Sequence, residues 1–180
     1  TFVYVADTDN AAVQVLNAND GSFVKSVHLF GPGNASNFQD PIGVSVGHSA
    51  SSAEEILVAD GVTGNVYVFD ASFTFLFTVA AFAETPAEGT RDAATDSAGN
   101  IYTADYRGNA VDKYSPTGVF ITRWGTGTPG PLDVAAPYGV DIDTADTPNR
   151  VYVASSNLEQ IKVVDTSGSP LNVGATGSNA

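Results

Sequence analysis

The sequence has 180 residues, 43% of them hydrophobic, and 20 acidic against 7 basic residues give it a formal net charge of −13. It contains no cysteine, which excludes a disulfide framework and a thiolate metal site, and no apolar run approaches the ~18 residues of a membrane span. So acidic a surface is a poor match for the phosphates of nucleic acid. We therefore expect no membrane span and no nucleic-acid partner, and we expect an extracellular or cell-surface protein.

A short run of β-branched and aromatic residues opens the chain and recurs three more times. The run closes on Ala-Asp, or on Ala-Ser in its last copy, and its type of sequence predicts a strand. The copies end at positions 7, 60, 105 and 155, which are spaced by 53, 45 and 50 residues. A period of this length indicates stacked supersecondary units.

Three further strand patterns accompany these copies. An alternating run follows each copy, at 10–16, 65–70, within 101–118, and at 160–165. A Pro-x-Gly-Val run precedes two copies, at 41–46 and 137–142, with a weaker version at 91–96, and a last run follows the turn at 23–30, 73–79 and 119–124. Each unit therefore predicts four antiparallel strands, as one blade of a β-propeller requires.

This combination of motifs resembles the NHL-repeat family of β-propellers, and residues 120–125 fit the family's exit strand well. The resemblance implies an all-β fold, a single domain over 1–180 with about four four-stranded antiparallel blades. The blades are expected near 1–30, 41–79, 91–124 and 137–175. The first blade lacks its Pro-x-Gly-Val strand, and residues 171–173 give the last blade a weak fourth strand at best.

Three arrangements of about four blades remain open: a compact four-bladed ring, a fragment of a larger ring, and an open arc completed by neighbouring subunits. An open arc leaves two unlike blade faces uncovered, and a head-to-tail contact between them generates a ring or a filament. Unpaired edge strands provide a second route to assembly. Because Thr1 lies inside a strand and is not methionine, we expect a processed or excised chain.

The loops are expected to carry recognition, because they are exposed and vary between blades. The aspartates at 7, 60 and 105 recur in three blades, so we interpret them as caps of their own turns. Residues present in one blade only are better candidates for a specific role. The predicted ligand- or partner-binding residues are Tyr106, Arg107, Arg91 and Tyr138.

Catalysis has little support in the sequence. It contains two histidines, His28 in a predicted strand and His48 in a predicted loop, whereas propeller enzymes resembling this family, such as the peptide-amidating lyases, hold a metal with several. No nucleophile-elbow motif is present. We expect no enzyme and no cofactor, with calcium at 17–21 or 141–146 as the alternative because both segments cluster oxygen ligands.

Asn34-Ala35-Ser36 is a sequon for N-glycosylation, and Thr126 and Thr128 are weaker candidates for O-linked glycans. The sequence thus predicts a non-catalytic extracellular module for protein interaction or self-assembly, as a structural subunit of a surface filament. Its expected partners are copies of itself or other proteins, and glycans. The alternative is a ligand-binding or sensor propeller that uses the loops around Tyr106, Arg107 and Tyr138, and a metal-dependent lyase or hydrolase ranks third.

Overall fold

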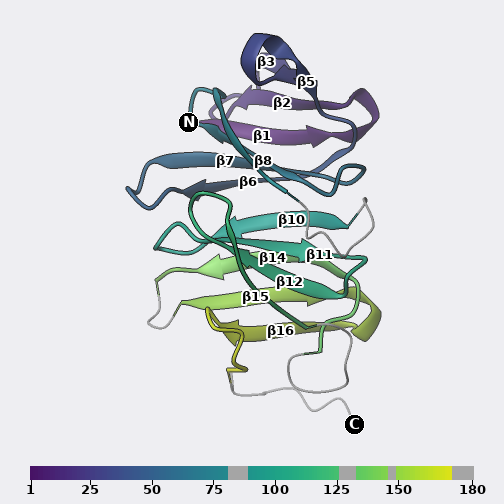
Figure 1. Ribbon diagram of the computed structural model, residues 1–180. Coiled ribbons are helices and arrows are strands. Elements are labelled where there is room, and N and C mark those ends of the chain that lie inside the picture. The colour runs from purple at the N-terminus through teal and green to yellow at the C-terminus, as the bar shows by residue number, and fades with distance from the viewer. Residues whose placement is uncertain (81–88, 126–132, 146–148, 172–180) are drawn as a thin grey trace.

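The computed structural model describes residues 1–80, 89–125, 133–145 and 149–171. Four antiparallel sheets follow one another from the N-terminus to the C-terminus (Figure 1), and we call them blades 1 to 4. Blade 1 consists of β1 (Phe2–Asp7), β2 (Ala12–Asn17) and β3 (Phe23–Val27). Blade 2 consists of β6 (Pro41–His48), β7 (Glu54–Asp60), β8 (Val66–Asp70) and β9 (Phe75–Val79).

The last two blades repeat this order. Blade 3 consists of β10 (Thr90–Thr95), β11 (Ile101–Asp105), β12 (Ala110–Tyr114) and β13 (Phe120–Trp124). Blade 4 consists of β14 (Pro137–Asp143), β15 (Arg150–Ser155) and β16 (Gln160–Asp165). Blades 1 and 4 lie at opposite ends of the molecule (Figure 1), so the described chain is not a closed four-bladed ring.

The repeat extends to local irregularities of the sheets. The pairing of the innermost strand with its neighbour shifts between Pro41 and Gly43 in blade 2, and the same shift recurs at the start of β10 and β14. Gly43 is required there because a Cβ on it would lie 2.5 Å from the carbonyl oxygen of Arg91. The glycine of the Pro-x-Gly motif in blade 2 therefore allows the close approach of β6 and β10.

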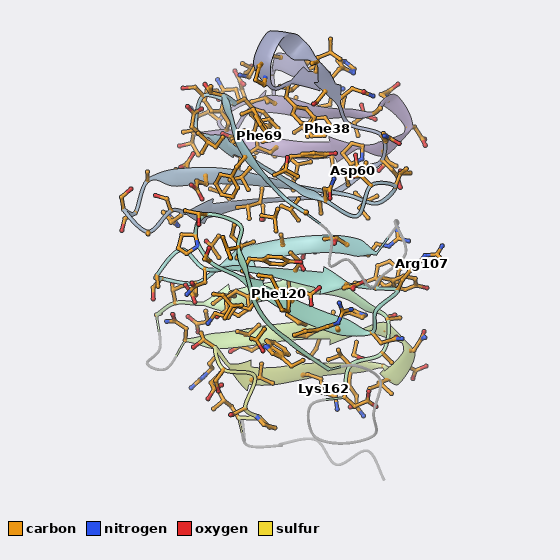
Figure 2. The ribbon with its side chains drawn as sticks, viewed as in Figure 1. Phe38, Asp60, Phe69, Arg107, Phe120 and Lys162 are labelled. Carbon is orange, nitrogen blue, oxygen red and sulfur yellow. The ribbon has the colours of Figure 1, made fainter. Side chains whose placement is uncertain are left out.

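The hydrophobic core lies between the blades. Between blades 1 and 2 it is rich in aromatic rings, and the ring centroids of Phe30 and Tyr67 are 4.5 Å apart. Phe38 and Phe69, labelled in Figure 2, belong to the same layer. Equivalent apolar layers join blade 2 to blade 3 and blade 3 to blade 4. Side chains of blades 2 and 3 therefore pack in both directions along the chain, as the alternation of strand side chains allows.

The prediction of antiparallel four-stranded sheets is confirmed, with corrections at their margins. Residues 23–30 do not form one strand: β3 ends at Val27, and β4 (Leu29–Phe30) pairs with β5 (Ser36–Asn37). The chain turns at His28 because Phe30 is buried against Phe38, at a centroid distance of 4.8 Å. His48, expected in a loop, is the last residue of β6.

Of the weak strand predicted at 171–173, Leu171 donates its N–H to the carbonyl oxygen of Val163 at 3.0 Å, next to a single bridge between Pro170 and Val164; residues 172 and 173 lie outside the described residues. Three 3₁₀ turns are present in the described chain: η1 (Thr8–Asn10), η2 (Pro32–Asn34) and η3 (Ser156–Leu158). No helix in the part of the chain that is described has the length and apolar character needed to span a membrane.

Candidate functional site

Three of the four residues predicted to bind a ligand or partner lie in one cluster. Arg91 belongs to β10, Tyr106 follows β11, and Tyr138 belongs to β14. The guanidinium carbon of Arg91 is 5.0 Å from the ring centroid of Tyr106 and 5.6 Å from that of Tyr138. The two rings are 5.0 Å apart and tilted by 67°. Cation–π attraction and an edge-to-face ring pair therefore hold this cluster together.

The cluster spans blades 3 and 4 and is partly accessible. Tyr138 is exposed, whereas Arg91 and Tyr106 are half-buried. The backbone N–H of Tyr106 donates to the carbonyl oxygen of Gly89 at 2.7 Å, which fixes the start of its loop. Arg107 is exposed at the margin of the molecule (Figure 2). The structure thus combines a fixed aromatic surface with a neighbouring exposed cation.

The recurrent aspartates mainly hold the backbone. One carboxylate oxygen of Asp60 accepts hydrogen bonds from the N–H groups of Val62 and Thr63, at 3.2 and 3.0 Å. Its other oxygen accepts from Gln39 and Asp40, at 2.7 and 3.1 Å, and therefore also anchors the segment that leads into β6. The predicted turn cap is confirmed here.

Asp105 and Asp7 vary this arrangement. Asp105 caps its turn by accepting from the N–H of Gly108 at 2.9 Å. The carboxylate of Asp7 instead accepts from the side-chain amides of Asn10 and Gln14, at 2.9 and 2.7 Å. The turn-cap prediction is thus confirmed for Asp105, while Asp7 stabilises its turn through side chains.

Sequence reasoning missed a buried ion-pair group in blade 3. Arg123 donates to the Asp105 carboxylate at 2.5 Å and lies 3.4 Å from the carboxylate of Asp112. Burial raises the pKa of Asp112 to about 7, although the positive charge of Arg123 opposes this rise. The charges come from three strands that become neighbours only through strand pairing, so no local motif marks the group.

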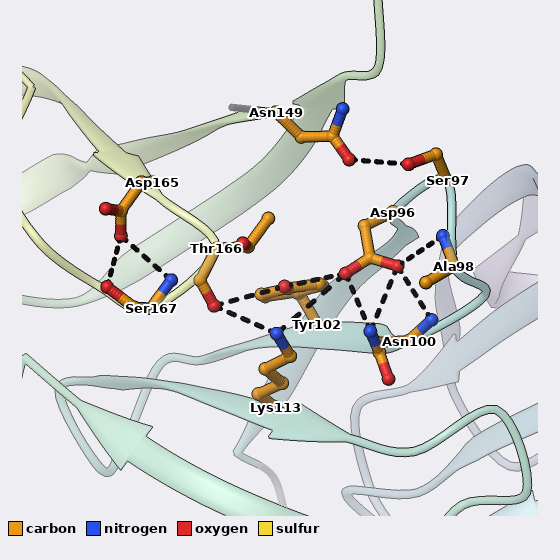
Figure 3. Close-up of polar contacts among 10 residues, drawn as sticks. All are labelled: Asp96, Ser97, Ala98, Asn100, Tyr102, Lys113, Asn149, Asp165, Thr166 and Ser167. Atoms are coloured by element: carbon orange, nitrogen blue, oxygen red, sulfur yellow. Dashed lines mark hydrogen bonds and ion pairs between the residues drawn. The ribbon is translucent and has the colours of Figure 1, made fainter. Parts of the chain in front are cut away.

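A second polar group joins blades 3 and 4 (Figure 3). The Asp96 carboxylate accepts hydrogen bonds from Asn100 and from the hydroxyl of Tyr102, the latter at 2.9 Å. Lys113 donates to the carbonyl oxygen of Thr166 at 2.9 Å and lies 3.9 Å from the Asp96 carboxylate. Because these groups satisfy one another, we interpret them as a clamp between the turns of two blades.

The outer face of blade 1 is largely apolar, and no described part of the chain covers it. The β1–β2 pair of blade 1 has the same register as the β7–β8 pair of blade 2. In this register Val3 occupies the position of Ile56, and Val5 occupies the position of Val58. Val5 is 41% exposed, whereas Val58 is fully buried. Exposed side chains of β3 extend this face, which we call the N-terminal face; its apolar members are Val3, Val5, Leu16, Phe23 and Val24.

The outer face of blade 4 corresponds to the face that blade 2 packs against blade 3. Its strand pairing makes Ile161 equivalent to Val66 of blade 2. Ile161 is 63% exposed, whereas Val66, which packs against blade 3, is 1% exposed. The surface around Ile161 carries shallow cavities of about 230 and 240 Å³. We call it the C-terminal face; its apolar members are Tyr152, Ala154, Ile161 and Val163.

The innermost strands β6, β10 and β14 line a groove of about 430 Å³. Asp92 lies in this groove, and burial raises its pKa to about 6. Its carboxylate accepts hydrogen bonds from the N–H groups of Ala93 and Val140, at 2.9 and 3.1 Å. Asp92 therefore joins β10 to β14, and we assign it a structural role.

Of the two segments considered for calcium, 17–21 forms a turn, whereas residues 141–143 belong to β14. Asn17 Oδ1 accepts from the N–H of Asn19, and Asp20 Oδ1 accepts from that of Ser22, both at 2.9 Å. Among the described residues, no three acidic or histidine side chains are arranged to hold a metal ion. The end of the 141–146 segment lies outside these residues, as do Thr126 and Thr128, while the Asn34 backbone forms part of η2.

No family model and no curated protein matches the sequence. The structure is similar to solved β-propeller proteins. A catalytically inactive virginiamycin B lyase from Staphylococcus aureus, with quinupristin, has a TM-score of 0.67 at 12% identity over 94% of this chain and 50% of its own. Kuenenia stuttgartiensis hydrazine synthase has a TM-score of 0.64 at 12% identity over 94% and 44%.

BBS1N in complex with ARL6DN has a TM-score of 0.59 at 14% identity over 92% of this chain and 47% of its own. This chain therefore spans about half the length of the proteins it matches. At such identities the likeness shows the fold alone. The β-propeller prediction is confirmed, and membership of the NHL family stays a prediction.

Proposed function

We propose that this chain is a non-catalytic interaction module that assembles with copies of itself, head to tail, through its N-terminal and C-terminal faces. One observation carries the proposal: Val5 and Ile161 are exposed, although Val58 and Val66, at the equivalent positions of blade 2, are buried. Each buried residue lies inside a blade interface, and each exposed residue lies on an outer face. The two outer faces are therefore the two complementary halves of the contact that joins consecutive blades.

Contacts between unlike faces do not close on themselves in a dimer, so they build rings or filaments. The chemistry of the contact is visible inside the chain, where Val66 and Val68 of blade 2 pack against Ile101 and Tyr114 of blade 3. An equivalent contact between copies would bring Ile161 and Val163 against Val3 and Val5. Burial of these apolar side chains favours association.

Two single substitutions test this mechanism, each measured by light scattering and sedimentation over a range of protein concentrations. Val5→Lys on the N-terminal face and Ile161→Lys on the C-terminal face should each abolish chain growth. Lysine is chosen because it lowers the net negative charge of −13, so added repulsion cannot explain a loss. Val119→Lys is the matched control, because Val119 is 64% exposed in the turn before β13.

Mixing the two variants gives the decisive result. The Val5→Lys copy keeps an intact C-terminal face, and the Ile161→Lys copy keeps an intact N-terminal face, so the mixture should form heterodimers that cannot grow. A wild-type chain that stays monomeric at every concentration, or two variants that fail to combine, would refute the head-to-tail contact.

We further propose that the protein is NHL-like, acts outside the cell or at its surface, and carries a glycan on Asn34. Its acidic, cysteine-free composition and its Asn-Ala-Ser sequon support this placement. Intact mass of native material before and after peptide N-glycosidase treatment tests the glycan. A native mass equal to that of the bare polypeptide counts against both Asn34 modification and the Thr126 and Thr128 candidates.

A ligand-binding role is the second candidate, and the cluster of Arg91, Tyr106 and Tyr138 favours it. Its rings and guanidinium offer stacking to a planar or sugar-like ligand, with the cation of Arg107 close by. The test is an array of glycans and acidic peptides probed with wild type and with the Tyr106→Ala and Arg107→Ala variants. Loss of a specific signal with assembly retained supports this role, and unchanged signals reject it.

A further inference from the structure

The innermost strands β6, β10 and β14 each carry one extra residue near their start. The pairing of β6 with β7 leaves out Ile42, and the pairings of β10 and β14 leave out Arg91 and Tyr138 at the same place. A β-bulge of this kind re-aims the side chain of the extra residue. Ile42, Arg91 and Tyr138 are therefore equivalent residues of blades 2, 3 and 4.

A second position belongs to the same end of each blade. Gly61 follows β7, Tyr106 follows β11, and Ser156 follows β15. The N–H of Tyr106 donates to the carbonyl oxygen of Gly89 at 2.7 Å, and the N–H of Gly61 donates to that of Asp40, also at 2.7 Å. The backbone therefore holds this position in the same way in blades 2 and 3, although the side chains differ.

Blade 2 shows that the fold does not need a cation or an aromatic ring at these two positions. There the pair is Ile42 and Gly61, and a Cβ on the glycine would lie 3.0 Å from Cδ1 of Ile42. In blade 3 the pair is Arg91 and Tyr106, with the guanidinium carbon 5.0 Å from the ring centroid. Construction of the blade does not account for these two side chains, which indicates a different role.

Arg91 is a cation to which the described residues offer no carboxylate. The ion pairs between described residues of blade 3 are made by Lys113 and Arg123, and none of them includes Arg91. The Nε atom of Arg91 is buried and has no hydrogen-bond partner within the described part of the chain. Since buried polar groups are nearly always hydrogen-bonded, this Nε–H indicates the place of an acceptor from outside the described chain.

A carboxylate is the acceptor that best fits Arg91. A guanidinium presents paired N–H groups in one plane, and a carboxylate accepts two of them at once. A phosphate has matching oxygens but carries close to two negative charges near neutral pH, and the net charge of −13 repels it more strongly. Tyr138 is 52% exposed, and its ring centroid lies 5.6 Å from the guanidinium carbon, so a ring attached to the carboxylate can stack beside it.

We propose that Arg91, Tyr106 and Tyr138 bind a ring that carries a carboxylate. The carboxylate accepts from the Nε–H and a terminal N–H of Arg91, and the ring packs on the exposed side of Tyr138. A uronate sugar and an aromatic acid share this chemistry. The inference rests on the ligand-binding role described above as the second candidate, and it names the class of ligand.

The test uses the Val5→Lys variant, because its substitution lies in blade 1 and prevents assembly from interfering. Methyl glucuronide and benzoate are compared with methyl glucoside and benzyl alcohol, which have similar rings without the carboxylate. NMR titration follows the side-chain Nε–H signal of Arg91 and the amide signals of Tyr106 and Tyr138. The two acids should move these signals saturably, with affinities about tenfold or more above those of their neutral counterparts.

Three further substitutions separate a fitted site from general attraction between charges. Arg91→Lys keeps the positive charge and loses the planar fork, so it should weaken binding of both acids about tenfold. Tyr138→Ala should weaken binding of both acids and leave the weaker binding of acetate unchanged. Lys162→Gln, which removes one positive charge from β16, is the matched control and should change the affinities by less than about twofold.

Equal binding of the acids and their neutral counterparts would overturn the proposal and leave a ligand-binding role in place. Phenyl phosphate binding more tightly than benzoate, or acetate binding as tightly as either ring acid, would also contradict it. An array signal that depends on Tyr106 but is not displaced by either acid would keep the role and reject this class of ligand. Absence of saturable binding by both acids overturns the inference, and absence of any array signal as well would reject the role itself.

Discussion

Replacing the buried Asp112 by asparagine should increase the free energy of unfolding relative to wild type, and this gain should be larger at neutral pH than at acidic pH. Asp112 is 1% exposed and lies 3.4 Å from Arg123, whose short hydrogen bond goes to Asp105 instead. The Asp112 carboxylate is thus removed from water, and its attraction to Arg123 only weakly offsets this loss of hydration. Asparagine keeps the shape and removes the charge.

The direction follows from the raised pKa of Asp112, which is about 7 in the folded protein against an ordinary 3.8. The folded state holds this proton more tightly than the unfolded chain, so stability is greatest at low pH and falls as pH rises from about 4 to about 7. This difference corresponds to at most about 4 kcal/mol. We expect Asp112→Asn to gain about 2 to 4 kcal/mol relative to wild type between pH 4.5 and pH 8.

Urea unfolding of both proteins between these pH values provides the measurement, with Asp70→Asn as the control. Hydrogen bonds from Thr74 hold the pKa of Asp70 below its ordinary value, so removing that carboxylate should destabilise the protein as pH rises through the acidic range. A difference between Asp112→Asn and wild type that does not change with pH would refute the reasoning. So would a variant that is less stable at pH 8, because the attraction to Arg123 would then outweigh desolvation.

Three other outcomes are expected. Tyr102→Phe should lower the free energy of unfolding by about 1 to 3 kcal/mol in urea titrations, because Asp96 loses a buried hydrogen-bond donor; no change would argue against the clamp between blades 3 and 4. Gly47→Val should cost about 1 to 3 kcal/mol or more, because its side chain would meet that of Thr95; a thermal midpoint equal to wild type would contradict that packing. Raising NaCl from about 0.02 M to about 0.5 M should strengthen self-association by screening the charge of −13, and weaker association in salt would indicate a contact made by ion pairs.

The repeat made the fold predictable, because each copy shows the same strand pattern and the copies can be aligned on positions 7, 60, 105 and 155. The residues of the cluster, Arg91, Tyr106 and Tyr138, were predictable because each is present in one blade only. Its geometry was not, since it depends on how β10 and β14 lie side by side.

The charged groups around Asp96 and Asp112 were missed for a related reason. Asp96 follows the end of β10, where an aspartate has an ordinary explanation as a turn cap. Asp112 lies inside β12, and it meets Asp105 and Arg123 only because three strands pair in one sheet. The split after Val27 was missed because residues 23–30 favour a strand throughout, and the burial of Phe30 against Phe38 overrides this local preference.

The outer faces differ from the internal interfaces in a way that bears on the proposed assembly. Tyr67 and Phe69 contribute aromatic rings to the contact between blades 1 and 2. The equivalent residues on the N-terminal face are Gln14 and Leu16, which are not aromatic. A contact between copies would therefore bury less aromatic area than a contact within the chain. This difference weakens the contact between copies, so we expect reversible assembly.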